Sequence, residues 1–280
     1  MGEQKERIAI EFISVLGLNP MAFVQVAADL GCRHIGLALQ PIVTCGAVDA
    51  RWSLRDDAAL RHDLVQALRD ANMAISVGEG FIALPQRNIL DVEPDLDLMA
   101  GLGVGCVNML SADPDPGRAA DQCACFADLA SDRGMTALLE FLPGMPAGYD
   151  LPSALAVVRK VDKPNFKLMI DTMHLFRSGG GVADVAALDR SAIGYLQLCD
   201  VPAVSAYANY ADEARYDRLS PGDGALPLRD LLKIIPRDVI VGLEVPMRAK
   251  AEAGIDARTR LSAAVQTTRA WLAEEDVGAM

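Results

Sequence analysis

Histidine, aromatic residues and positive charge are all scarce in this sequence. Aromatic residues make up 5% of it. Its three histidines, His34, His62 and His174, are far apart in the sequence. A metal site built from several histidines is therefore not expected. The formal net charge is -12, and a surface this acidic repels phosphate backbones and anionic lipids. Neither nucleic acid nor a membrane surface is an expected partner.

Long hydrophobic runs and paired cysteines are also missing. No apolar run reaches the roughly 18 residues of a membrane span. The first seven residues are charged and lead directly into a predicted strand, so we expect no signal peptide and a cytoplasmic protein. The cysteines include no Cys-x-x-Cys pair and lie mostly in apolar runs, so we expect reduced, buried thiols. They are Cys32, Cys45, Cys106, Cys123, Cys125 and Cys199.

Short apolar runs alternate with amphipathic segments along the chain. The predicted strands cover residues 8–12, 33–37, 73–77, 104–110, 136–140, 166–170, 194–198 and 239–243. The predicted helices cover residues 20–30, 53–71, 93–102, 116–133, 151–160, 182–188, 226–234 and 256–274. Eight strand–helix units predict a parallel (β/α)8 TIM barrel. The main alternative is an open doubly wound sheet, but no GxGxxG follows the first strand. We predict one domain over residues 1–280, with tails at 1–6 and 275–280.

Polar residues stand at the carboxyl ends of several predicted strands, which in a barrel point into one shared site. Glu140, Asp171 and Glu244 end the fifth, sixth and eighth strands, and Gln197 lies near the end of the seventh. Oxygen ligands of this kind suit Mg²⁺, Mn²⁺ or Co²⁺. A single acid at a strand end is more often a helix cap or a surface ion-pair partner. For Glu140 and Glu244 that alternative is weaker, because a proline follows each within three residues.

Other polar residues are candidates for substrate contacts. His174, three residues after Asp171, is placed to support a ligand or to carry a proton. The predicted substrate-binding residues, each of which could equally be a surface or structural residue, are Glu79, Asn108, Arg177, Asp200, Arg218 and Arg248. The loops 41–53 and 202–226 are expected to shape specificity. Tyr207, Tyr210 and Tyr216, in the second loop, either line the pocket or pack on the surface.

Five short motifs in this order resemble the xylose isomerase-like TIM-barrel superfamily, in its sugar phosphate isomerase/epimerase branch. They are Leu-Leu-Glu140-Phe, Asp171-Thr-Met-His174-Leu, Gln197-Leu-Cys-Asp200, Arg218-Leu-Ser-Pro-Gly-Asp-Gly and Glu244-Val-Pro. The resemblance covers nearly the whole chain. It implies one divalent ion held by Glu140, Asp171, the seventh-strand residue and Glu244. It also implies that the two glutamates act as acid and base on either side of the substrate.

The sequence departs from this family's pattern at Gln197, where most members have histidine. A neutral amide oxygen is a harder ligand than imidazole, so the site is expected to favour Mg²⁺ or Mn²⁺ over Zn²⁺. Glutamine at this place also resembles some 3-dehydroshikimate dehydratases of the superfamily. The superfamily's metal-dependent apurinic endonucleases are a poor match, because their metal centres are rich in histidine and their substrate is DNA.

The expected function is that of a metal-dependent sugar or sugar phosphate isomerase or epimerase. Glu140, Glu244 and His174 would move protons of a small polyhydroxylated carbonyl substrate through a metal-stabilised enediolate. One alternative is a metal-dependent lyase of the 3-dehydroshikimate dehydratase or inosose dehydratase type, which would use the same groups. Another is a non-catalytic binding barrel, although all three carboxylates are present. Barrels that resemble this one commonly pair, so a homodimer is a further expectation.

Overall fold

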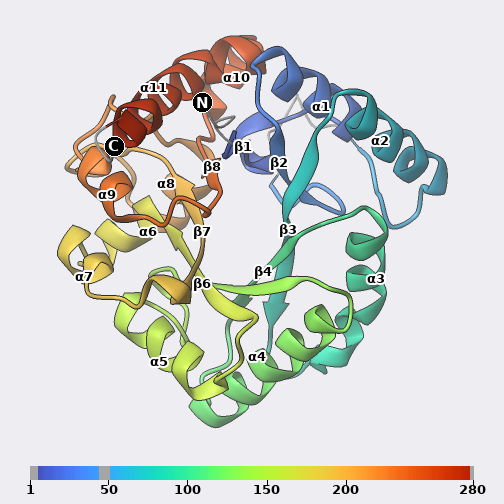
Figure 1. Cartoon of the computed structure of the whole chain (residues 1–280), viewed down its shortest axis with the longest axis vertical. Coiled ribbons are helices and arrows are strands. Elements are labelled where there is room, and N and C mark those ends of the chain that lie inside the picture. Colours follow the sequence, from blue (N-terminus) through green and yellow to red (C-terminus); the bar gives the residue numbers. More distant parts are fainter. Residues whose placement is uncertain (1–5, 44–50, 278–280) are drawn as a thin grey trace.

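Eight parallel strands close into a barrel with helices on the outside (Figure 1). The structure, a computed structural model, describes residues 6–43 and 51–277. Each strand pairs with its neighbours in chain order, and β8 pairs with β1 to close the barrel. The strands are β1 (Ile8–Ile10), β2 (His34–Ala38), β3 (Ala74–Ala83), β4 (Cys106–Ser111), β5 (Thr136–Glu140), β6 (Phe166–Asp171), β7 (Ile193–Leu198) and β8 (Val241–Leu243). The predicted (β/α)8 barrel is confirmed.

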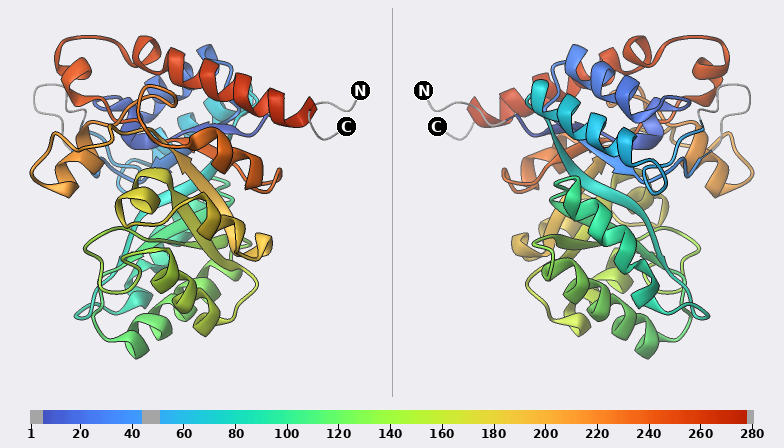
Figure 2. Two further views of the ribbon diagram at one scale, coloured as in Figure 1. Left: turned by 90° about the vertical axis from the view of Figure 1, so that its left-hand side faces the viewer. Right: turned by 90° about the vertical axis from the view of Figure 1, so that its right-hand side faces the viewer.

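Helices surround the barrel (Figures 1 and 2). They are α1 (Pro20–Asp29), α2 (Ala58–Asp70), α3 (Glu93–Gly101), α4 (Pro116–Ser131), α5 (Leu151–Val161), α6 (Thr172–Arg177), α7 (Val182–Ala186), α8 (Tyr210–Tyr216), α9 (Leu228–Ile234), α10 (Arg248–Glu252) and α11 (Ala257–Val277). The long helix α11 lies beside α1 and packs against β1. Within the described ranges, no helix combines the length and the apolar character that crossing a membrane requires.

The inside of the barrel has an apolar layer and, next to it, a polar layer. The apolar layer is a buried cluster of Val77, Leu138, Met169 and Tyr195, against which the partly buried Cys106 and Ile240 pack. Two positions further along the strands of Val77, Cys106, Leu138, Met169 and Tyr195 stand Glu79, Asn108, Glu140, Asp171 and Gln197. Side chains of a strand alternate between its faces with a period of two, so both sets share the inner face. The polar set lies nearer the carboxyl ends of the strands.

Glu11 enters this interior from the end of β1. Its carboxyl group is fully buried, and its Oε1 accepts a hydrogen bond of 2.7 Å from the Tyr195 hydroxyl. Two glycines on the neighbouring strands leave the space for it. A Cβ on Gly242 would lie 2.7 Å from Glu11 Cδ and 2.9 Å from Tyr195 Cε1, and a Cβ on Gly36 would lie 2.8 Å from the same Cδ. The absence of side chains at these positions therefore lets a carboxyl group into the barrel.

Replacing Gly242 with alanine is expected to lower the free energy of unfolding by about 1–3 kcal/mol, as overpacking of an interior typically does. The added methyl group must displace the Glu11 carboxyl group or the Tyr195 ring. Urea unfolding measures the loss. Gly101→Ala, at the end of α3, is the control, because a Cβ there meets no atom within 4 Å. An equal loss in both variants would contradict this account of the interior.

Several predicted bounds differ from the structure; β1, for example, ends at Ile10 and α2 begins at Ala58. The largest differences concern one strand and three helices. The strand predicted over residues 73–77 continues to Ala83, and Phe81, Ile82 and Ala83 still pair with β4. The helices α6, α8 and α10 have six, seven and five residues and lie in segments predicted to be loops. Helices this short are not stable by themselves, so tertiary contacts decide whether they form.

The structure describes five of the six cysteines and only part of the predicted loop 41–53. Five cysteines are free thiols, of which Cys32, Cys123 and Cys199 are buried, whereas Cys106 and Cys125 are partly buried. The sixth, Cys45, and the middle of the predicted loop 41–53 lie outside the described residues.

Candidate functional site

Eight of the predicted site residues come together at the carboxyl ends of the strands. They are Glu79, Asn108, Glu140, Asp171, His174, Gln197, Arg218 and Glu244, and all are buried. Six of them belong to a strand or follow one directly, His174 lies in α6, and Arg218 comes from the segment after α8. Hydrogen bonds and ion pairs join all eight into one network. The convergence expected of strand ends in a barrel is therefore present for these eight residues.

Arg218 lies between two of the carboxylates. Its Nη1 is 2.5 Å from Asp171 Oδ2 and 2.7 Å from Glu244 Oε2, and its Nε donates to the carbonyl oxygen of Ala214. Although burial opposes it, the guanidinium holds the pKa of Asp171 well below its usual range. Burial raises the pKa of Glu244 well above its usual range, against the effect of Arg218. Asp171 is thus the ionised partner of Arg218, and Glu244 is the carboxyl group better suited to hold a proton.

Asp171 has a second role at the start of α6. Its Oδ1 accepts a hydrogen bond of 2.9 Å from the backbone N–H of His174, so Asp171 is the N-cap of this helix. Asp171 is therefore a helix cap, which is the alternative given above for a single acid at a strand end, and it also lies in the predicted site. The cap fixes the carboxylate, and it places the His174 ring beside it.

Gln197 is fully buried, and its amide group has a defined orientation. Its Nε2 donates to Glu79 Oε1 at 2.9 Å and to Glu244 Oε1 at 3.1 Å, whereas its Oε1 has no hydrogen-bond partner among the described residues. Carboxylate oxygens accept hydrogen bonds, so they hold the amide nitrogen and turn the amide oxygen the other way. Burial, followed by the negative charge of Glu11, raises the pKa of Glu79.

Glu140 is held by two nitrogen groups. Asn108 Nδ2 donates to Glu140 Oε2 at 2.6 Å, and His174 Nε2 lies 3.2 Å from Glu140 Oε1. Glu140, Asp171 and His174 each offer a ligand atom, and these atoms lie within 4.8 Å of one another. The spacing is suitable for a metal ion.

The donor set fits a divalent cation. The site holds four buried carboxyl groups, those of Glu79, Glu140, Asp171 and Glu244, and Arg218 forms ion pairs with the last two. The buried Gln197 Oε1 has no hydrogen-bond partner within residues 6–43 and 51–277, which costs about 1–3 kcal/mol unless a ligand satisfies it. Oxygen ligands from carboxyl and amide groups are those that Mg²⁺ and Mn²⁺ prefer. An ion that uses both Asp171 and Glu244 must share their oxygens with Arg218 or displace it.

The three other residues predicted to bind substrate have different contacts. Arg177 pairs with the buried Glu213 at 2.8 Å. Asp200 accepts hydrogen bonds from the backbone N–H groups of Val201, Gly222 and Leu226, so it shapes the loop after β7. Arg248 lies over the ring of Tyr216, 4.0 Å from its centroid. The structure does not bring these three into the network of the other eight.

Glu11 makes the stability of the protein depend on pH. Burial and, after it, the charge of Glu244 raise the pKa of Glu11 from 4.5 to about 8. The folded protein then keeps a proton that the unfolded chain has released, and this contribution is lost as the pH rises through 8. We expect the free energy of unfolding of the EDTA-treated protein to fall between pH 5 and 9, and to fall less steeply in Glu11→Gln. Urea unfolding at each pH tests this, and an unchanged slope in the variant would contradict it.

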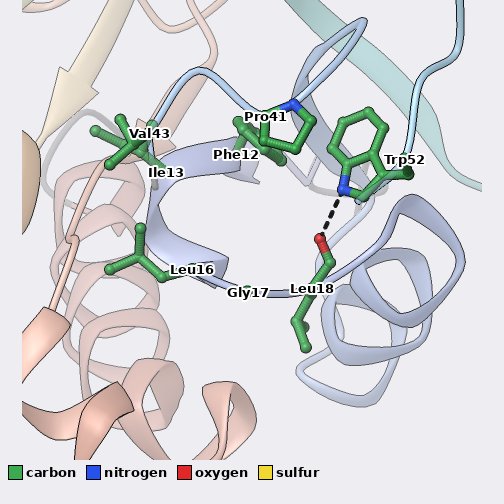
Figure 3. A pocket seen from close by; sticks show the side chains of 8 residues that line it. All are labelled: Phe12, Ile13, Leu16, Gly17, Leu18, Pro41, Val43 and Trp52. Atoms are coloured by element: carbon green, nitrogen blue, oxygen red, sulfur yellow. Dashed lines mark hydrogen bonds between the residues drawn. The ribbon is translucent and has the colours of Figure 1, made fainter. Parts of the chain in front are cut away.

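A small apolar pocket lies beside the ends of β1 and β2 (Figure 3). It is lined by residues of the 3₁₀ helix η1 (Phe12–Val15), by the segment that follows it, and by Pro41, Val43 and Trp52. Trp52 donates from Nε1 to the carbonyl oxygen of Leu18 at 3.2 Å and meets Phe12 edge to face. The described residues that line this pocket include no charged side chain, so they suit an apolar part of a ligand better than a polyhydroxylated one.

The structure places three further residues in or beside the network: Glu11, Tyr195 and Tyr210. The sequence predicts Glu11 or Phe12 at the end of the first strand and Tyr210 either in the pocket or on the surface, and it predicts no role for Tyr195. A usable signal existed for Glu11 and Tyr195, because Tyr195 precedes Gln197 by two positions and Glu11 directly follows β1. For Tyr210 there was none, since it lies in a long segment without periodicity.

Two curated proteins are similar to parts of this chain. A 3-dehydroshikimate dehydratase of Pseudomonas aeruginosa is 28% identical over 151 residues, which are 52% of this chain and 24% of that protein. A "Putative hydroxypyruvate isomerase" of Streptomyces coelicolor is 30% identical over 189 residues, which are 59% of this chain and 62% of that protein. The chain thus matches less than two thirds of the length of either relative.

A solved structure and a family model each match most of the length of this chain. The solved structure of the IOLI protein with a binding zinc atom superposes with a TM-score of 0.77 at 17% identity, covering 96% of this chain and 99% of that one. This likeness shows the shared fold. The model of the family described as xylose isomerase-like TIM barrel matches residues 24–272. With a closed eight-stranded barrel and most of its length matched, the chain belongs to the xylose isomerase-like TIM-barrel family.

Proposed function

We propose that this barrel catalyses metal-assisted proton transfer at the carbon next to a carbonyl group of a small polyhydroxylated substrate, as an isomerase or epimerase. The observation that carries the proposal is the arrangement of Glu140 and Glu244. They are two buried carboxyl groups held by different partners, and the site also contains the amide oxygen of Gln197, which has no partner in the part of the chain that the structure describes. A proton acceptor and a proton donor in separate environments are what a two-step proton transfer needs.

Glu140 is the base in this proposal. It takes the proton, and the electron pair of the broken C–H bond forms the double bond of an enediolate. Arg218 offsets the negative charge that develops on the substrate oxygen. Glu244, or His174, then returns a proton. Return to the neighbouring carbon, with the hydroxyl proton passing to the former carbonyl oxygen, interconverts an aldose and a ketose. Return to the opposite face of the same carbon gives an epimer.

Glu140, Asp171, Gln197 and Glu244 are the residues we assign to a divalent ion. When bound, the ion would supply positive charge at the substrate oxygens. An oxygen-only donor set favours Mg²⁺ or Mn²⁺ over Zn²⁺. Metal content after purification and after dialysis against EDTA tests this assignment, together with Gln197→Leu, which removes the amide oxygen and is expected to weaken Mg²⁺ binding.

A dehydratase is the second candidate, and Gln197 favours it. Glutamine at this position resembles some 3-dehydroshikimate dehydratases, and the Pseudomonas aeruginosa relative carries that name. The same base would remove the proton next to the carbonyl group, and a hydroxyl group on the adjacent carbon would leave as water. The initial proton removal is shared by both candidates.

Exchange of substrate protons with D₂O distinguishes the candidates. Ketoses, aldoses, their phosphates and 3-dehydroshikimate are incubated with the protein and Mg²⁺ and followed by proton NMR, with Glu244→Gln and EDTA-treated protein as controls. Deuterium entering a sugar with isomer or epimer formation supports the first candidate, and an unsaturated or aromatic product supports the second. No exchange with any substrate, together with no bound metal, would overturn the proposed function.

A further inference from the structure

His174 lies between three groups that compete for its two ring nitrogens. The side chain is buried, with Nε2 at 3.2 Å from Glu140 Oε1. Its Nδ1 is 2.5 Å from the hydroxyl oxygen of Tyr210 and 3.5 Å from Asp171 Oδ1. Asp171 Oδ1 already accepts the backbone N–H of His174, and Asp171 Oδ2 contacts Arg218. The nearer and less occupied partner of Nδ1 is therefore Tyr210.

The chemistry of these partners decides where the ring hydrogen lies. A neutral imidazole has one N–H and one lone pair, and an ionised carboxylate can only accept. A hydrogen bond to Glu140 therefore needs the hydrogen on Nε2, which leaves Nδ1 as an acceptor. The hydroxyl group of a tyrosine, with an ordinary pKa of about 10, keeps its hydrogen at neutral pH and can donate it. Both contacts are satisfied by one tautomer only.

We propose that Tyr210 is a positioning residue that holds His174 in the tautomer with hydrogen on Nε2. The Nε2–H then donates to Glu140 Oε1, while Asn108 donates to Glu140 Oε2, so both oxygens of the carboxyl group are fixed. A second consequence concerns the metal. In this tautomer neither ring nitrogen has a free lone pair, so His174 is not a metal ligand. Gln197 is then the neutral ligand among the four residues assigned to the ion.

The surroundings of Tyr210 fit this role. It is the first residue of α8, whose N-cap is Asn209, and its ring lies 5.8 Å from the His174 ring between centroids. The ion pair between Arg177, at the end of α6, and the buried Glu213 of α8 joins the same two helices. Arg177 thus helps to hold Tyr210 against His174. Only the role of Glu140 as a base rests on the proposed function; the tautomer does not.

The test is the tautomer itself, measured by ¹⁵N–¹H NMR of the histidine ring nitrogens. The spectra are recorded at about pH 8.5, above the usual pKa of histidine, in the EDTA-treated protein. His174→Gln identifies the signals among the three histidines. We expect Nδ1 of His174 to be unprotonated and Nε2 to carry hydrogen. Hydrogen on Nδ1 alone, or on both nitrogens, would overturn the proposal.

Tyr210→Phe tests the cause. Loss of the donated hydrogen bond is expected to shift the tautomer ratio towards hydrogen on Nδ1 by roughly 2–10-fold, with the signals of His34 and His62 unchanged. Tyr207→Phe is the matched control, because the Tyr207 hydroxyl contacts Asp217 in the same segment. An unchanged ratio in Tyr210→Phe overturns the proposal. So does the disappearance of the Nε2 hydrogen when Mg²⁺ binds, because His174 would then be a ligand. Neither measurement needs a substrate, so the proposed function can fail independently.

Discussion

Replacing Arg218 with methionine is expected to lower the free energy of unfolding at pH 7 by about 3–5 kcal/mol, as loss of one partner of a buried ion pair typically does. Arg218 is 4% exposed, and its guanidinium contacts Asp171 and Glu244, which are themselves buried. Methionine keeps much of the side-chain volume and removes the charge. The loss therefore comes from carboxylates that remain buried without their cation. Urea unfolding of the EDTA-treated protein measures it.

Arg55→Met is the control for this prediction. Arg55 pairs with Asp95 at 2.6 Å, but this pair is partly exposed, so its loss is expected to cost only about 0–1 kcal/mol. A divalent ion that binds Asp171 and Glu244 offsets the lost charge, so Mg²⁺ is expected to restore part of the stability of Arg218→Met. Equal losses in the two variants would show that the guanidinium does not neutralise these carboxylates.

Replacing Glu140 with glutamine is expected to slow exchange of the substrate proton with D₂O by roughly 10²–10⁴-fold, the usual contribution of a general base. Glutamine has nearly the same shape but cannot take up the proton. The amide nitrogen of this glutamine would also face a hydrogen-bond donor, either Asn108 Nδ2 or His174 Nε2. We therefore expect a loss of stability as well, smaller than that of Arg218→Met.

The exchange rate of Glu140→Gln is compared with that of Glu93→Gln, a substitution in the first turn of α3 that leaves the network untouched. The comparison uses the substrate and the Mg²⁺ concentration that give exchange in the unchanged protein. If Glu140→Gln retains a tenth or more of the rate, another group removes the proton, and Glu244 is the next candidate.

Most of the barrel and the composition of its mouth could be predicted from the sequence. Strand β5 was predicted with its observed bounds, and the carboxylates Glu140, Asp171 and Glu244 were placed together because parallel strands of a barrel end at one face. The contacts of Arg177 and Arg248 could not be predicted, because Glu213 and Tyr216 lie in a short helix without a periodic signal. The assignment of residues 1–280 to one domain, a cytoplasmic location and a homodimer stay predictions.

The sequence by itself determined the fold and the inner layer of polar side chains. Side chains along a strand alternate between its two faces, so residues two positions apart share a face, and this is a local property of the sequence. Only the tertiary structure decided how these groups are paired. Arg218 lies 47 residues from Asp171, Tyr210 lies 36 residues from His174, and Glu79 lies 118 residues from Gln197. The first two contacts depend on how the segment after β7 closes over the barrel, and the third depends on the barrel bringing β3 and β7 to face each other. No local pattern in the residues encodes either arrangement.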